Sequence, residues 1–400
     1  MDMVRAPFGS GILILLLWLA GLGAAAQFAK FAVPFAALRE AYSAAGAEVG
    51  WLLTTISAIG AVFGMTAGVL VARVGLARAV IGALILGGVL SLWQATVPSL
   101  SMMLASRLIE GVSHLMLVVA TPTLIAQIAS DRYRGVSMTL WSTFFGVSFA
   151  LMAWLGLPLV ASSGLGALLI AHGVFMLAIA GVLATVMGWP APSTPTVSAS
   201  IASVLRQHVE AYRSPNLAAP AVGWLFYTMT FVALLAVLPD LLPPDDRAAV
   251  ATLMPLVSIA VALVAVSALL SVFSAVAITV FGFLASALVV LLFFASVPLA
   301  AVSIGVFAVL GLVQGASFAA VPELNTTNET RALANGALAQ AGNIGNLVGT
   351  PLLLATLGVG GHGGMLLAVA TLYLAGGAAH ILMARARARA ETADHSVEDL

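Results

Sequence analysis

The chain alternates between long runs of apolar residues and short polar breaks. A membrane-spanning helix needs about 20 mostly apolar residues, and most of the runs are near this length. The breaks carry turn signals or charges. The predicted spans are residues 10–36, 49–71, 78–97, 100–128, 136–160, 164–188, 217–239, 248–271, 274–295, 298–321, 333–357 and 363–384. The pattern therefore predicts an all-α integral membrane protein with twelve transmembrane helices.

Composition supports a membrane protein and excludes several other classes. Hydrophobic residues make up 62% of the 400 residues and charged residues only 8%, and the mean hydropathy is +1.13. Soluble proteins carry roughly 25% charged residues. The formal net charge is zero, so no overall positive field attracts nucleic acid. The absence of cysteine excludes disulfides and thiolate metal sites. We expect a monomer in a bacterial cytoplasmic (inner) membrane.

The arginines orient the chain, because cytoplasmic loops carry an excess of positive charge. With both termini in the cytoplasm, only Arg39 and Arg247 fall outside. The arginines that then lie inside are Arg5, Arg73, Arg78, Arg132, Arg134, Arg206, Arg213, Arg331, Arg385, Arg387 and Arg389. The opposite orientation would reverse this bias, so we expect cytoplasmic termini.

One long polar linker, 189–216, divides the predicted spans into six and six. It separates an N-terminal bundle at 1–188 from a C-terminal bundle at 217–384. A cytoplasmic tail at 385–400 follows the second bundle. A glycine and proline pattern that ends at Pro158 in the first half is echoed by one that ends at Pro351 in the second. Such internal repeats are typical of transporters with a binding site near the bilayer midplane.

This organisation resembles the major facilitator superfamily. The stretch GVLVARVGLAR at 68–78 is similar to the family's cytoplasmic loop motif, with Gly68, Arg73, Gly75 and Arg78 at its positions. Ala72 stands where the family has an acid that braces a helix end. RLIEG at 107–111 is similar to the family's R-x-x-Q-G in span 4. The resemblance implies two six-helix bundles that expose a central site by alternating access, with residues 68–78 as the gating loop.

Span 4 holds three polar residues that share one helix face, Arg107, Glu110 and His114, at i, i+3 and i+7. A charge at the bilayer centre costs about 2.5–3.5 kcal/mol on insertion scales, so such residues normally face a partner or a wet cavity. One interpretation is a self-satisfied Arg107–Glu110 pair that only fixes span 4. The other is a substrate site with Glu110 as the proton carrier.

Span 1 favours the second interpretation. Gln27 and Lys30 lie three residues apart, and at 1.5 Å per residue Lys30 and Arg107 are both about 10 Å outward of the midplane. The resemblance places spans 1 and 4 side by side along the cavity. Two cations, one carboxylate and one histidine in the same space would suit a carboxylate-bearing substrate. The alternative for Lys30 is that it reaches the outer membrane surface.

Span 11 presents Gln340, Asn343 and Asn346 on one arc, next to an arc of glycines at 342, 345 and 349. The glycines permit close helix contact, whereas the amides would bind either substrate or a neighbouring helix. By family position alone, Tyr227, Thr230 and Gln314 are further candidates for the cavity.

We therefore expect a secondary transporter, not an enzyme, that moves a small organic anion and needs no cofactor. Proton-coupled uptake is favoured over proton-coupled efflux of drugs or metabolites, because span 5 lacks the glycine-proline signature of many antiporters in this family. A non-transporting membrane receptor is a third class, and no feature of the sequence specifically favours it. Copper import is a minor alternative: His172 and Met176 are four residues apart in span 6, His380 and Met383 lie near the end of span 12, and histidine and methionine bind Cu(I).

Overall fold

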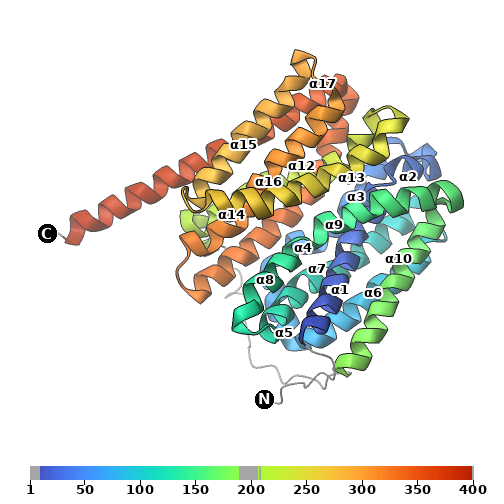
Figure 1. Cartoon of the computed structure of the whole chain (residues 1–400), viewed down its shortest axis with the longest axis horizontal. Helices are drawn as coiled ribbons and strands as arrows, with labels where there is room; N and C mark the ends of the chain where they lie inside the picture. Colours follow the sequence, from blue (N-terminus) through green and yellow to red (C-terminus); the bar gives the residue numbers. More distant parts are fainter. Residues whose placement is uncertain (1–9, 189–205, 207–208, 399–400) are drawn as a thin grey trace. The chain divides into compact units, whose positions relative to one another are not determined.

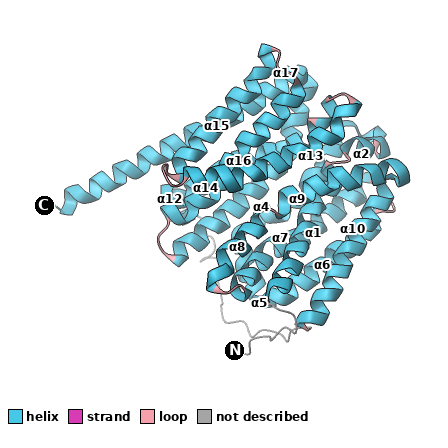
Figure 2. Cartoon of the chain, viewed as in Figure 1, coloured by secondary structure: helices cyan, strands magenta, loops and turns pink. Residues whose placement is uncertain are grey.

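The computed structural model describes residues 10–188, 206 and 209–398, and within these ranges every regular element is helical (Figure 2). The first part of the chain forms α1 (Ser10–Ala32), α2 (Phe35–Ala41), α3 (Trp51–Thr54), α4 (Ala58–Phe63), α5 (Ala67–Val74), α6 (Leu76–Gln94), α7 (Leu100–Ile128), α8 (Asp131–Ser142), α9 (Phe144–Leu151) and α10 (Leu157–Met187). The later part forms α12 (Pro215–Val237), α13 (Pro244–Ala260), α14 (Val266–Leu269), α15 (Ala275–Leu291), α16 (Leu299–Leu324) and α17 (Asn328–Glu398). The prediction of an all-α protein is confirmed for the described residues.

Ten segments of the described chain are long and apolar enough to cross a membrane. They are Gly11–Ala32, Glu48–Thr66, Leu76–Gln94, Leu100–Ile128, Phe144–Met187, Pro215–Val237, Pro244–Leu269, Ala275–Ala295, Leu299–Leu324 and Thr330–Arg389. Their positions match the predicted apolar runs, with the runs at 136–160 and 164–188 sharing one segment and those at 333–357 and 363–384 sharing another.

Two of these segments are too long to be single spans. Phe144–Met187 has 44 residues, which would extend about 66 Å as one straight helix, twice the thickness of the hydrocarbon core. It is interrupted at Gly164 (φ 81°, ψ 170°), and Thr330–Arg389 is interrupted at Gly361 (φ 60°, ψ −159°). These backbone conformations are open to glycine and strained for other residues. Gly164 is the first residue of the predicted span 164–188, and Gly361 lies between the predicted spans 333–357 and 363–384.

The helices pack as two compact units, one made of the described residues of Met1–Ala199 with Leu235–Leu256, the other of those of Ser200–Leu234 with Val257–Leu400. In the first unit α1 contacts α6, α7, α9 and α10 (Figure 1). The core between them is built from side chains such as Leu17, Leu84, Leu117 and Leu183, all without exposed surface. This packing holds α1 and α7 in contact, which brings the polar residues of spans 1 and 4 together.

In the second unit, glycines of α17 let α12 approach closely. A Cβ atom on Gly345 would lie 2.6 Å from the Leu225 carbonyl oxygen, and one on Gly349 would lie 2.0 Å from that of Met229. Real Cβ atoms do not come so close to backbone oxygen atoms, so no side chain fits at either position. The prediction that the glycine arc of span 11 serves close helix contact is confirmed.

The two units repeat several packing details at a separation of 200 residues. Pro122 lies inside α7 and Pro322 inside α16. A Cβ on Gly111 would meet the Ile56 carbonyl oxygen at 2.4 Å, and one on Gly311 would meet that of Ser258 at 2.3 Å. Each half thus folds its fourth long helix against its second through the same glycine. The repeat links residues of the first unit to counterparts in the second.

Candidate functional site

A buried ion network forms where α1, α6 and α7 meet in the first unit. Lys30, Arg107 and Glu110 have no exposed surface. The Lys30 Nζ atom lies 2.6 Å from Oε1 of Glu110, and Arg107 Nη1 donates to Oε2 of the same carboxylate. Glu110 is therefore shared between two cations. The sequence interpretation of an isolated Arg107–Glu110 pair is incomplete, because Lys30 is the third member.

Lys30 is held by polar groups on all sides. Its ammonium group donates to Ser91 Oγ at 3.0 Å and to Gln94 Oε1 at 2.7 Å, in addition to Glu110. An ammonium group has three N–H donors, and each has a partner here. The alternative in which Lys30 extends to the outer membrane surface is wrong for this structure, because the side chain turns inward onto a carboxylate and is fully buried.

Arg107 is less completely bound. Its Nε atom donates to the Leu52 carbonyl at 2.8 Å, and Nη1 donates to the Gln27 carbonyl at 2.8 Å. The guanidinium carbon lies 4.5 Å from the centre of the Phe31 ring. Its Nη2 atom is buried and has no hydrogen-bond partner among the described residues. The network therefore holds two cations against one anion and retains an unused cationic N–H group.

Gln94 on α6 completes the network, and no argument from the sequence selected it. It accepts from Lys30, and its Nε2 donates to Glu110 Oε2 at 2.9 Å and to Ser106 Oγ at 3.1 Å. Ser91, one turn earlier, contacts Lys30 from the same helix. Two polar residues three apart on an otherwise apolar span were the available signal. Only the packing of α6 on α1 and α7 reveals their partners.

The side chains of Gln27 and His114 lie next to the ion network and bond to other groups, although the Gln27 backbone carbonyl accepts from Arg107. Gln27 Nε2 donates to Ser113 Oγ at 2.8 Å, while its Oε1 is buried without a partner among the described residues. His114 Nδ1 lies 3.0 Å from the Ala24 carbonyl oxygen, and its ring stands edge-on against Phe28. The hydrogen bond of His114 is thus with α1 backbone and not with Glu110.

The second unit brings Tyr227 and Gln314 together. The Tyr227 hydroxyl donates to Gln314 Oε1 at 3.1 Å, and Ser258 Oγ donates to the same oxygen at 3.3 Å. Thr230 instead donates to the carbonyl of Tyr227 on its own helix at 3.0 Å. Tyr227 also stacks between Trp224 and Phe231, with ring centres 4.6 and 5.0 Å away. This cluster carries no formal charge.

The repeat shows how different the two units are chemically. The counterparts of Lys30, Arg107 and Glu110, 200 residues later, are Thr230, Phe307 and Leu310. The ion network therefore has no equivalent in the second unit, although the glycine and proline positions that set the helix packing are kept.

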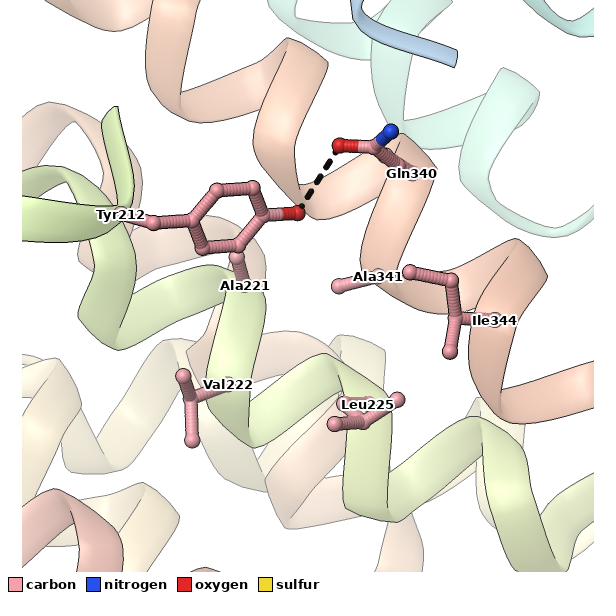
Figure 3. A pocket seen from close by; sticks show the side chains of 7 residues that line it. All are labelled: Tyr212, Ala221, Val222, Leu225, Gln340, Ala341 and Ile344. Atoms are coloured by element: carbon pink, nitrogen blue, oxygen red, sulfur yellow. Dashed lines mark hydrogen bonds between the residues drawn. The ribbon is translucent and has the colours of Figure 1, made fainter. Parts of the chain in front are cut away.

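The amides of span 11 occupy separate places on α17. Gln340 lines an open hollow of about 320 Å³ and accepts from the Tyr212 hydroxyl at 3.1 Å (Figure 3). The rest of this hollow is apolar, with Val222 and Leu225 on α12 and Ile344 on α17. Asn343 bonds back to the Ala339 carbonyl at 2.9 Å, and Oδ1 of Asn346 is buried without a partner among the described residues.

The 68–78 loop forms the turn between α5 and α6. Gly75 has φ 92° and ψ 134°, a conformation that favours glycine, whereas Gly68 sits inside α5 with open space around it. Arg73 is exposed and Arg78 half-buried. Position 72 carries alanine, but a carboxylate does brace a helix end elsewhere. Glu323 at the end of α16 accepts from the backbone N–H of Ala275 at 2.7 Å, at the start of α15. The carboxylate brace that we found therefore lies in the second unit.

Of the two histidines considered for copper, His172 is already occupied. His172 Nδ1 lies 2.9 Å from Ser91 Oγ, and its Nε2 lies 3.1 Å from the Gly23 carbonyl oxygen. Neither ring nitrogen is open to a soft metal ion in this arrangement. Over the described part of the chain, no group of three or more histidine or acidic residues could hold a metal.

Comparison with known protein families agrees with this architecture. The sequence profile of the Major Facilitator Superfamily matches residues 13–350, which is most of the chain and includes parts of both units. A search among curated proteins finds no match. The profile match covers the ion network, the loop at 68–78 and the Tyr227–Gln314 cluster. The chain therefore belongs to the Major Facilitator Superfamily.

Proposed function

We propose that this secondary transporter moves a small organic anion, with Lys30 and Arg107 binding its carboxylate. The observation that supports this substrate class is the charge of the buried network, two cations against one anion, with the Nη2 atom of Arg107 unpartnered. A buried charge is costly unless it is paired and hydrogen-bonded. A substrate carboxylate would supply the missing negative charge and the missing acceptor.

Proton coupling follows from the way Glu110 is shared. A substrate carboxylate that approaches Lys30 and Arg107 competes with Glu110 for their N–H groups. Glu110 would then lose the two cations that keep it ionised and would accept a proton more readily. Binding of anion and binding of proton would favour each other, as linkage requires for symport.

Glu110→Gln separates binding from coupling. We expect this variant to exchange labelled substrate across the membrane of proteoliposomes but no longer to concentrate it under an imposed proton gradient. Its uptake should also depend less on pH between about pH 5 and 8 than that of the wild type. Normal accumulation with an unchanged pH profile would show that the proton is carried elsewhere or that the protein is a uniporter.

The substrate class is tested by ligand-induced thermal shifts of the purified protein with small organic acids, amines and drugs. We expect carboxylates such as benzoate to raise the melting temperature of the wild type but not of Lys30→Ala or Arg107→Ala. Selective stabilisation by cations would refute the anion site. Movement of drugs in the direction opposite to that of the protons would favour the efflux alternative.

We also propose twelve spans with cytoplasmic termini, because Gly164 and Gly361 divide the two overlong segments into four helices. The two bundles would be residues 1–188 and 217–384, with alternating access around a central site. Gln340, Asn343, Asn346, Tyr227, Thr230 and Gln314 would contribute from the second bundle, and Gln27 and His114 from the first. Reporters fused after Leu400 and within the linker at 190–215 should both signal cytoplasm. An extracellular signal from either would overturn this topology.

A further inference from the structure

The buried network contains a fourth ionisable side chain, His172, whose ring joins it through Ser91. His172 lies on α10 and is 5% exposed. Both of its ring nitrogens have polar contacts, Nδ1 with Ser91 Oγ at 2.9 Å and Nε2 with the Gly23 carbonyl oxygen at 3.1 Å. Ser91 Oγ also accepts from Lys30 at 3.0 Å, so one hydroxyl group connects the histidine to the ion network.

The hydrogen-bond partners of His172 restrict the protonation state of its ring. A backbone carbonyl only accepts, so the contact with Gly23 requires a hydrogen atom on Nε2. The Ser91 hydroxyl has one hydrogen, which it donates to the Leu169 carbonyl at 2.9 Å. Ser91 Oγ can then only accept from Nδ1, which requires a second ring hydrogen. All four contacts form together only when His172 is protonated on both nitrogens.

The neutral ring also fits, at the loss of one contact. When only Nε2 carries hydrogen, the Ser91 hydroxyl can turn from the Leu169 carbonyl to the lone pair of Nδ1. The bond from Lys30 to Ser91 persists in both states, because it uses a lone pair of Oγ. The opposite neutral tautomer does not fit, because it would set the Nε2 lone pair against the Gly23 carbonyl. His172 can thus take up or release a proton by one rotation of a hydroxyl group.

We propose that His172 is a second proton-binding residue of the transport site and that anionic substrate promotes its protonation. The inference rests on the proposed anion site. The charged groups that act electrostatically on His172 are Lys30 on α1 and Arg107 and Glu110 on α7, and its hydrogen-bond partner on α6 is the Ser91 hydroxyl. With no anion bound, a proton on His172 would add to an existing excess of one positive charge. A bound carboxylate cancels that excess, so the proton and the anion stabilise each other.

The two proton sites differ in what protonation does. A proton on Glu110 removes the carboxylate that binds Lys30 and Arg107 and so dissolves the ion network. A proton on His172 leaves every contact of Glu110 in place. His172 can therefore hold the proton while the substrate is recognised, with its positive charge close to the anion.

The test is ¹⁵N NMR of the full-length protein labelled at histidine, with benzoate as the probe. His172→Asn identifies the signal by its loss. In the unliganded wild type we expect the Nε2–H tautomer or the doubly protonated ring. Benzoate should raise the ratio of protonated to neutral His172 at a fixed pH about fivefold or more, the lower end of typical coupling between sites. Neutral benzamide should leave the ratio unchanged.

His380 provides a matched internal control. It is a buried histidine on α17 that packs against Gly223, the counterpart of Gly23, but its ring nitrogens have no hydrogen-bond partner among the described residues. Its signal should not respond to benzoate. A neutral Nδ1–H tautomer at His172, or a His172 signal that ignores benzoate although benzoate binds in a Lys30-dependent manner, would overturn the inference alone. If no carboxylate binds at all, the anion site fails, and the linkage of His172 to it is refuted as well.

Discussion

Removing the shared carboxylate should destabilise the first unit far more than removing one of the cations that it binds. Glu110→Gln leaves Lys30 and Arg107 buried beside each other without a counter-charge. Breaking a buried ion pair in this way costs about 3–5 kcal/mol of unfolding free energy. Lys30→Met instead leaves Glu110 bound to Arg107 and Gln94 and brings the network to neutrality. It loses the three hydrogen bonds of the ammonium group, of which the one to Glu110 is worth about 1.5–3 kcal/mol, but also removes the desolvation cost of an ammonium ion.

We therefore expect the net cost of Lys30→Met to be about 1–2 kcal/mol at most, well below that of Glu110→Gln. The double variant should recover about 0.5–3 kcal/mol relative to the sum of the single variants, because the two residues contact each other. Unfolding in mixed detergent micelles, followed by tryptophan fluorescence, measures these differences. Leu108→Ala is the control, since Leu108 adjoins Arg107 but is 42% exposed. A Lys30→Met cost equal to or above that of Glu110→Gln would refute the view of Glu110 as the central counter-charge.

Two further predictions use the same unfolding measurement. Gly349→Ala should cost about 1–3 kcal/mol, because the new Cβ would lie 2.0 Å from the Met229 carbonyl oxygen and force α12 and α17 apart. Gly181→Ala, with no atom within 4 Å of the new Cβ, should be neutral or stabilising, and an equal loss at both positions would contradict the close-contact argument. Burial raises the pKa of the Asp240 carboxyl, and this effect outweighs the opposing influence of Arg247 and Arg39. The folded state therefore binds this proton more readily than the unfolded state, and the protein loses stability as pH rises. Asp240→Asn should therefore raise the melting temperature at pH 7 and raise it less at pH 4, and a gain that is larger at pH 4 would reverse this sign.

The hydrophobic pattern located the long apolar helices because the constraint behind it is local. Each stretch that crosses hydrocarbon must be apolar along its whole length, and this can be counted on the sequence. The glycine arc of span 11 was predictable for a similar reason, since three small residues on one face permit close packing whatever the partner is. The partner itself, α12 through Leu225 and Met229, required the structure.

The ion network was only half predictable. Arg107 and Glu110 share a helix turn, so their pairing could be inferred from spacing. Lys30 could be assigned a similar depth, but its contact with Glu110 depends on the rotation of α1, which no periodicity fixes. Ser91, Gln94 and His172 come from two more helices and carry weak signals singly. In the sequence His172 suggested a metal ligand, because its true partners, Ser91 and the Gly23 carbonyl, lie far from it along the chain.

The repeat separates the residues that build the fold from those that carry the chemistry. Gly111 and Gly311 both admit a carbonyl oxygen of a neighbouring helix, and Pro122 and Pro322 occupy the same place in α7 and α16. The two glycines occupy equivalent positions where backbone contact leaves no room for a side chain. Immediately before the shared glycine, Glu110 corresponds to Leu310. A leucine there satisfies the packing at no electrostatic cost, so folding alone does not require a buried carboxylate with two cations in the first unit. Since burying these charges opposes stability, their presence is best explained by the anion and the proton that we propose they bind.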